Sequence, residues 1–409
     1  MDLPELLAPA GNLKKLKVAL DYGADAVYCG GKEFGLRAKA ENLSREEMAK
    51  AIDYAHQRSK SVYVTVNIIP HNSELEQIID YLKFLQDIEV DGAIISDPGV
   101  LYLLSQENIE LPLHLSTQAN TVNWASANFW HSQGLKRLIL ARELSRGEIS
   151  DIVEKTGDIE LEIFVHGAMC ISYSGRCLLS NYLTGRDANR GECAQPCRWQ
   201  YNLVERERPD QYFPVTEDEN GTYIMNSRDL NLLAKIPEVV ETGVDSLKIE
   251  GRMKSCNYVA TVTSVYREAL DHYKNSPTDY VMKEEWQKQL KKISHRPYTI
   301  GFFEGPPGEK GQNYKSSSYI RKYRFIGIVK GYQPESRLAI VRVKNKFSLG
   351  EEIEIFGPGC KVIEQEVEEL YDSEGESIEE ALHPESIVKL KVKEDVGENF
   401  IIRREIDEK

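Results

Sequence analysis

Residues 61–69 read SVYVTVNII, a mainly apolar run that lies between two amphipathic helical patterns, REEMAKAIDYAHQRS at 45–59 and SELEQIIDYLKFLQDI at 73–88. Apolar strands that alternate with helices are typical of parallel strands buried on both faces of one sheet. The same alternation recurs along the first 170 residues. This pattern predicts an α/β fold with parallel strands.

Seven such runs precede the cysteine-rich part of the chain, at 5–10, 25–31, 61–69, 92–97, 111–117, 136–142 and 161–167. Seven repeats favour a closed barrel over an open doubly wound sheet. An eighth unit is available as a helix at 227–243, a strand at 245–251 and a final helix at 254–273. We therefore expect a (β/α)8 TIM-like barrel over about residues 1–300, with a cysteine-rich insertion at about 168–225 after strand seven.

A change of pattern follows the barrel. Residues 301–318 are rich in Gly, Pro, Ser and Lys and are predicted to form a linker. From 319 to 409 the runs YRFIGIVKGY, RLAIVRVKN, EEIEIFGPG, KVIEQEVEEL and ESIVKLKVK alternate apolar and polar residues, with turns between them. This alternation predicts a small antiparallel all-β barrel as a C-terminal domain.

Composition and charge indicate the compartment in which the protein works and the partners that it can bind. No apolar stretch approaches eighteen residues, and MDLPELLAPAG lacks the basic and apolar segments of a signal peptide, so neither a membrane span nor secretion is expected. Seven unevenly spread cysteines argue against a disulfide framework and favour a reducing cytoplasm. The net charge of −14 disfavours a nucleic-acid partner on average, although residues 315–346 carry nine Lys and Arg against one Glu. This basic strip is either a phosphate-contacting surface or a solvated strand face.

The active site of such a barrel lies at the C-terminal ends of its strands. Four cations near these ends, Arg37, Arg142, Lys248 and Arg252, are predicted to bind an anionic ligand such as a carboxylate or phosphate. His166 stands where strand seven enters the cysteine-rich segment and is a candidate acid–base residue. The alternatives are solvated rim positions for the cations and a structural hydrogen-bonding role for His166.

Four of the seven cysteines, Cys170, Cys177, Cys193 and Cys197, occur with the spacing C-x6-C-x15-C-x3-C. Zinc sites usually show two tight C-x2–4-C pairs, and only the last two cysteines fit that pattern. A [4Fe–4S] cluster also takes four cysteines and tolerates looser spacing, so the cluster is favoured over zinc. Structural or redox-active cysteines without a metal remain a third interpretation. The C-x3-C-x2-C run of radical S-adenosylmethionine enzymes is absent.

The stretch EIFVHGAMCISYSGRCLLS resembles the signature of peptidase family U32, the collagenase-like proteases. The matching positions are Glu162, Phe164, Gly167, Cys170, Gly175, Cys177 and Ser180. The resemblance continues at LLAPAG and VYCGG near the start, at Gln195–Arg198 and at KIEGRMKS (248–255), and it covers essentially the whole chain.

Family members that resemble this chain are bacterial proteins that form 5-hydroxyuridine at the wobble position of tRNA. The resemblance implies prephenate as co-substrate and a [4Fe–4S] cluster on Cys170, Cys177, Cys193 and Cys197, although a more distant cysteine replaces the last one in some members. The cationic rim would then hold prephenate. Arg321, Lys322 and Arg324 of the basic strip would contact phosphates of the tRNA anticodon loop.

Two other functions remain open at this point. One is the peptidase activity for which the family is named, although the chain contains neither H-E-x-x-H nor G-x-S-x-G, which leaves Cys170 with His166 as the pair to consider. The other is a non-catalytic subunit that delivers tRNA or electrons, because members of the family can work in pairs with a paralogue.

Overall fold

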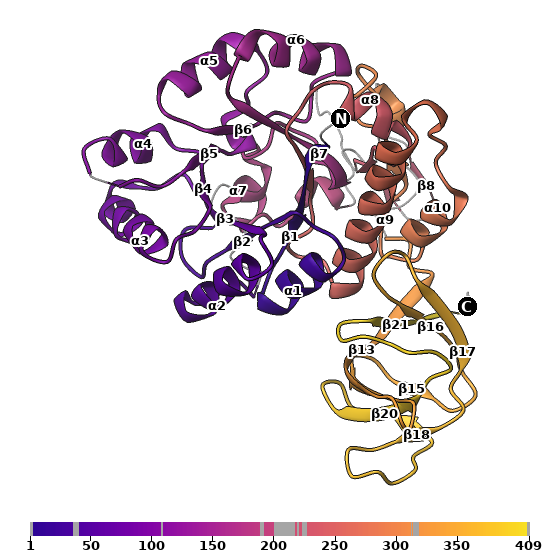
Figure 1. Cartoon of the computed structure of the whole chain (residues 1–409). Helices are drawn as coiled ribbons and strands as arrows, with labels where there is room; N and C mark the ends of the chain where they lie inside the picture. The colour runs from indigo at the N-terminus through magenta and orange to yellow at the C-terminus, as the bar shows by residue number, and fades with distance from the viewer. Residues whose placement is uncertain are drawn as a thin grey trace.

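The computed structural model describes residues 3–35, 41–107, 109–188, 192–199, 217–218, 221–222, 227–311, 313 and 319–406. In this part of the chain eight parallel strands close into a barrel, and an antiparallel β domain lies beside it (Figure 1). The barrel strands follow one another around the barrel in chain order, and the last one pairs with both the seventh and the first. They are β1 (Glu5–Pro9), β2 (Ala26–Gly30), β3 (Ser61–Val66), β4 (Gly92–Ile95), β5 (Leu113–Leu115), β6 (Arg137–Ile139), β7 (Glu160–Ala168) and β11 (Ser246–Ile249). The predicted (β/α)8 fold is confirmed.

Helices surround the barrel in Figure 1, and several begin at a side-chain cap. Asn12 accepts a hydrogen bond from the Lys15 amide, and Ser44 and Glu47 form a reciprocal capping box, which satisfies amides that lack partners within the helix. The helices are α1 (Leu13–Asp21), α2 (Arg45–His56), α3 (Leu75–Asp87), α4 (Pro98–Leu104), α5 (Trp124–Ser132), α6 (Arg146–Thr156), α7 (Leu179–Thr184), α8 (Ile236–Val240), α9 (Cys256–Asn275) and α10 (Glu284–Lys291). Within the described ranges, no helix combines the length and the apolar content needed to cross a bilayer.

The helix predicted at 227–243 is wrong in its first half. The structure has a short strand, β10 (Asp229–Asn231), then a 3-10 turn at Leu233–Lys235, and α8 begins only at Ile236. β10 pairs antiparallel with the end of β7, so tertiary hydrogen bonds outweigh the helical pattern of this segment. Pro237 then stands in the first turn of α8, where a missing amide hydrogen costs nothing.

The C-terminal domain is antiparallel and all-β, as its sequence predicts. Its main sheet has the order β17-β16-β21-β13-β14-β20-β18. Gln365 of the edge strand β17 is buried and links this strand to the end of β20. Its side chain donates to the Lys391 carbonyl oxygen at 2.8 Å and accepts from the Lys393 amide at 3.0 Å. The strands are β13 (Tyr323–Gln333), β14 (Leu338–Val343), β16 (Glu352–Phe356), β17 (Val362–Glu366), β18 (Leu370–Tyr371), β20 (Ile387–Lys391) and β21 (Ile401–Glu405), with a separate pair, β15 (Phe347–Ser348) and β19 (Glu380–Ala381).

The two domains meet through a buried junction. The hydroxyl of Tyr22, the C-cap residue of α1, donates to the Phe356 carbonyl oxygen at 2.7 Å. Arg403 of β21 is fully buried and donates to Glu354 at 3.0 Å and to Thr261 of α9 at 3.2 Å. Apolar side chains from α1, α9 and the β domain pack around these bonds: Val18, Tyr22, Cys256, Ala260, Ile328, Phe356 and Ile401. Burial of both apolar and charged groups holds the β domain at one place against the barrel.

Replacing Arg403 with Leu should destabilise this junction, because Glu354 and Gln289 would lose a buried donor. We expect a loss of about 3 kcal/mol in the free energy of unfolding, measured by urea denaturation. Arg404→Leu is the matched control, since Arg404 pairs with Glu351 at a partly exposed position and should cost less than about 1 kcal/mol. Equal losses for the two variants would contradict a buried ionic junction.

Candidate active site at the barrel mouth

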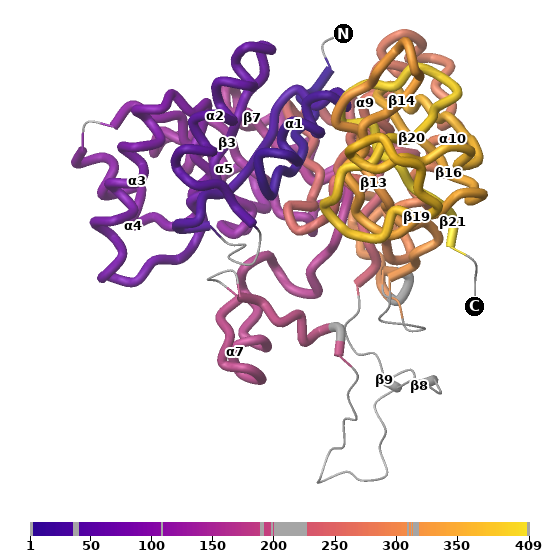
Figure 2. Tube along the Cα trace, turned by 90° about the horizontal axis from the view of Figure 1, so that it is seen from below, coloured from indigo at the N-terminus to yellow at the C-terminus, as the bar shows by residue number. Residues whose placement is uncertain are grey.

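The segment that follows β7 lies over the C-terminal mouth of the barrel. Gly167 has a φ of +112°, and a Cβ there would meet the Glu250 carbonyl oxygen, just after β11, at 2.5 Å. Gly175 has a φ of +76°, and a Cβ there would lie 3.0 Å from the side chain of Gln118, which follows β5. Arg142 donates to the Ala168 carbonyl oxygen at 2.6 Å. These contacts place residues 167–175 across the ends of several strands, and α7 projects beyond that end of the barrel (Figure 2).

All four cysteines of the predicted metal site lie on this segment. Cys170 and Cys193 are exposed, and Cys177 and Cys197 are half-buried. The Gln195 amide donates to the Cys193 sulfur at 3.4 Å. Accessible thiols on one loop are the donor chemistry that an iron–sulfur cluster needs. The thiols are too far apart in this structure to bind a cluster together. Among the described residues, no three His, Cys, Asp or Glu side chains lie close enough to hold a metal ion.

The three remaining cysteines, Cys29, Cys256 and Cys360, lie outside this segment. Burial raises the pKa of the Cys29 thiol to about 12 and that of Cys360 to about 11, and it also raises the pKa of Cys256. Because the thiolate is the metal-binding form, these positions are poor ligands and behave as small apolar side chains.

Inside the barrel a charged network replaces apolar packing. Glu162 of β7 is 0% exposed; it accepts from Lys248 Nζ at 2.7 Å and lies 3.4 Å from the Arg137 guanidinium. Arg137 also pairs with Glu5 at 2.6 Å and with Glu160 at 2.7 Å. Burial lowers the pKa of Lys248, and the attraction of Glu162 opposes that shift. Lys248 is therefore an interior, paired cation in place of the open rim cation expected from the sequence, and its anion-binding role stays a prediction.

Sequence reasoning missed the partners of Lys248. Glu162 and Arg137 each interrupt an otherwise apolar barrel strand, LEIFVHG and KRLILAR respectively. Charged residues within strands buried on both faces require partners inside the fold. This interruption was the signal that could have identified the network.

The two remaining described cations do reach the mouth. Arg252 is buried and donates to the Thr65 hydroxyl, at the end of β3, at 2.7 Å. Its guanidinium passes so close to Gly30 that a Cβ there would lie 2.2 Å from it. Arg142 is half-buried, stacks over Phe164 at 3.9 Å, and its Nε has no hydrogen-bond partner among the described residues. Arg37 lies outside the described residues. Arg142 and Arg252 are thus the cations that the structure places at the mouth.

His166 does not face the mouth. The pairing of β7 with β11 shifts register at Ile249, and the His166 ring packs against three tyrosines, Tyr258 and Tyr266 of α9 and Tyr298. The imidazole is 1% exposed, and burial lowers its pKa to about 3. A neutral, enclosed imidazole favours the structural role over the acid–base role predicted for it.

The nucleic-acid residues predicted from the basic strip lie at the surface. Arg321, Lys322 and Arg324 are all exposed where β13 begins. Farther along the strip the cations pair with acids, as Lys330 does with Glu398 at 3.0 Å. The start of β13 is therefore the part of the strip where exposed cations gather, and the tRNA contact stays a prediction.

Replacing Glu162 with Gln should destabilise the barrel, because the buried charges of Lys248 and Arg137 would lose their shared carboxylate. We expect a cost of about 3 kcal/mol in the free energy of unfolding, read from urea denaturation. Glu160→Gln is the control: this carboxylate also pairs with Arg137 but is 49% exposed, so its loss should cost less than about 1 kcal/mol. A cost for Glu162→Gln no larger than the control's would show that the network is not structural.

The low pKa of His166 predicts a pH dependence of stability. Between about pH 3 and pH 6.5 the unfolded chain binds a proton at His166 that the folded chain does not. The contribution of the neutral imidazole to the free energy of unfolding is therefore complete above pH 6.5 and is lost as the pH falls toward 3. His166→Gln should lower the slope of unfolding free energy against pH, between pH 5 and 6, by about 1 kcal/mol per pH unit. The exposed His131→Gln should leave the slope unchanged; an unchanged slope for His166→Gln would mean that the imidazole is not held neutral.

Comparison with known proteins agrees with this architecture. The chain matches the model of "Peptidase family U32" over residues 11–313 and that of "Peptidase family U32 C-terminal domain" over residues 321–403. It is 43% identical to "tRNA hydroxylation protein P1" of Bacillus subtilis, over 98% of this chain and 94% of that protein. It is 39% identical to "tRNA hydroxylation protein P" of Escherichia coli, over 98% and 96%. It is 31% identical to "Collagenase" of Porphyromonas gingivalis, over 90% and 89%. The chain belongs to peptidase family U32.

Proposed function

We propose that this protein hydroxylates tRNA, converting the wobble uridine to 5-hydroxyuridine with prephenate as co-substrate. The observation that carries the proposal is the similarity to relatives named for tRNA hydroxylation, which extends over almost the whole chain and includes both domains. The barrel mouth supports it, because cations and accessible thiols meet there.

Within this proposal, Cys170, Cys177, Cys193 and Cys197 hold a [4Fe–4S] cluster, with zinc as the lesser alternative. Such a cluster supplies redox chemistry that protein side chains lack. The thiols are not gathered in the structure, so cluster binding requires the segment after β7 to close around it. We therefore derive no chemical step through the cluster.

The cations at the mouth suit the proposed co-substrate. Prephenate is a dicarboxylate, and guanidinium groups bind carboxylates through paired hydrogen bonds. The Arg142 Nε lacks a partner among the described residues, and Arg252 reaches the ends of β2 and β3. These two residues would bind and orient the anion beside the cysteine segment.

The tRNA would approach from the side of the C-terminal domain. Arg321, Lys322 and Arg324 are exposed there and would contact backbone phosphates. A base of the single-stranded anticodon loop can enter a pocket without the cost of opening a duplex. A family paralogue could complete the complex in the cell.

The peptidase alternative has less support from the geometry. A cysteine protease needs a thiolate beside an imidazole. His166 is buried against the tyrosines of α9, whereas Cys170 is exposed on the segment over the mouth. The pair considered from the sequence is therefore not arranged for nucleophilic attack.

The proposal is tested in a strain that lacks the gene and carries either the wild-type chain or a cysteine variant. Mass spectrometry of tRNA nucleosides should show 5-hydroxyuridine derivatives restored by the wild type and absent with Cys170→Ala or Cys177→Ala, because both thiols would be cluster ligands. Cys360→Ala is the control, since that half-buried thiol lies in the C-terminal domain and should preserve the modification. Full restoration by Cys170→Ala and Cys177→Ala would contradict the assignment of the cysteines. Unchanged nucleoside levels in the strain without the gene would contradict tRNA hydroxylation itself.

A further inference from the structure

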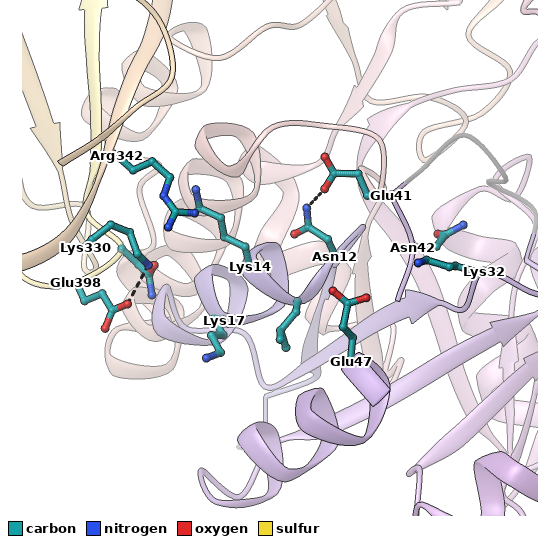
Figure 3. A pocket seen from close by; sticks show the side chains of 12 residues that line it. Asn12, Lys14, Lys17, Lys32, Glu41, Asn42, Glu47, Lys330, Arg342 and Glu398 are labelled. Atoms are coloured by element: carbon teal, nitrogen blue, oxygen red, sulfur yellow. Dashed lines mark hydrogen bonds and ion pairs between the residues drawn. The ribbon is translucent and has the colours of Figure 1, made fainter. Parts of the chain in front are cut away.

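A cavity of about 480 Å³ lies where the barrel meets the C-terminal domain (Figure 3). Five cations line it: Lys14 and Lys17 of α1, Lys32 after β2, Lys330 of β13 and Arg342 of β14. They come from both domains, so neither domain alone forms the site. The sequence analysis predicted no role for the three barrel lysines.

The three acidic side chains that line the cavity already accept hydrogen bonds from neighbouring residues. Glu398 accepts from Lys330 at 3.0 Å, Glu47 accepts from the Ser44 amide at 2.9 Å, and Glu41 accepts from Asn12 (Figure 3 shows the first and the last of these bonds). With five cations against three carboxylates, the cavity carries excess positive charge on a protein whose net charge is −14. A local charge opposite to that of the whole protein is evidence for an anionic ligand.

The surroundings of Lys14 are the most specific indication that the cavity binds an anion. The Lys14 Nζ atom is buried and has no hydrogen-bond partner among the described residues. Burial lowers the pKa of Lys14 to about 8, and the neighbouring cations Lys344, Arg342 and Lys330 contribute to this shift. In Figure 3 the Lys14 and Arg342 side chains lie near each other from opposite walls. A buried ammonium without an acceptor is unfavourable, and an anion with several oxygens would supply acceptors to both walls.

The cavity walls are held in place before any ligand binds. Tyr22, the C-cap residue of the helix that carries Lys14, donates to the Phe356 carbonyl oxygen. The side-chain amide of Asn399, in the cavity wall, donates to Asp21 at 2.8 Å. The cavity also borders the barrel mouth, because Asn12 follows β1 and Lys32 follows β2. A ligand bound here would therefore lie beside the proposed active site.

We propose that this cavity binds a backbone phosphate of the RNA substrate. Lysine ammonium groups, with three donors each and flexible stems, suit a phosphodiester that must be held without reading sequence. The inference rests on the proposed function, and it adds a second phosphate contact that depends on both domains. A free phosphate has the same chemistry, so the experiment must separate the two sources.

The test measures binding of tRNA to full-length Lys14→Gln and Arg342→Gln, one variant from each wall, over a range of salt concentrations. Each variant should bind roughly tenfold more weakly at low salt and should lower the slope of log affinity against log salt by about one unit. Lys288→Gln is the control, because Lys288 is an exposed lysine of α10 outside the cavity, and it should match the wild type. Thermal unfolding checks the fold: Lys14→Gln should melt at or above the wild-type temperature, since it removes a desolvated charge.

Three outcomes overturn the inference. If the wild type binds tRNA with a steep salt dependence and both variants match it, the cavity proposal fails while the proposed function stands. If the wild type does not bind tRNA, both fail. If inorganic phosphate raises the melting temperature of the wild type but not of Lys14→Gln, while tRNA binding is unchanged, the cavity holds free phosphate and not RNA.

Discussion

The pairing of β7 with β11, together with that of β11 with β1, closes the barrel. β7 and β11 come from distant parts of the chain, and the buried ion pair of Glu162 with Lys248 joins them inside the barrel. Because a lone buried charge would be costly there, loss of either partner is expected to destabilise the contact between these strands. The segment with the cysteines leaves the end of β7, so barrel closure brings it to the mouth.

The cations proposed to bind anions lie at two adjacent places. Arg142 and Arg252 lie at the mouth itself. Lys14 and Arg342 line the cavity between the domains, where α1 and the β domain meet through the buried junction around Tyr22 and Arg403. A small dicarboxylate would bind at the mouth, and the phosphates of a larger polyanion would bind in the cavity between the domains. The C-terminal domain is therefore expected to contribute to substrate binding through its fixed position as well as through its own cations.

The sequence predicted the features that depend on local patterns. Apolar runs separated by helices identified the barrel, period-two alternation identified the β domain, and the cluster of cysteines identified the segment over the mouth. Features decided by tertiary contacts were not predictable in this way. The shift of register beside Ile249 turns His166 toward α9, and pairing with β7 makes Asp229–Asn231 a strand. Charged residues within apolar strands indicate a buried network, but which of them pairs with Lys248 depends on how the barrel closes. The cationic cavity depends on two domains docking, which no single stretch of sequence shows.

We propose that the segment after β7 carries an iron–sulfur cluster at the mouth of the barrel. Chemical analysis of iron and acid-labile sulfide in anaerobically purified protein tests it most directly. We expect about four iron and four sulfide per chain, with an electron paramagnetic resonance signal after reduction. Stoichiometric zinc without iron, or a protein that retains no metal under strictly anaerobic handling, would contradict it.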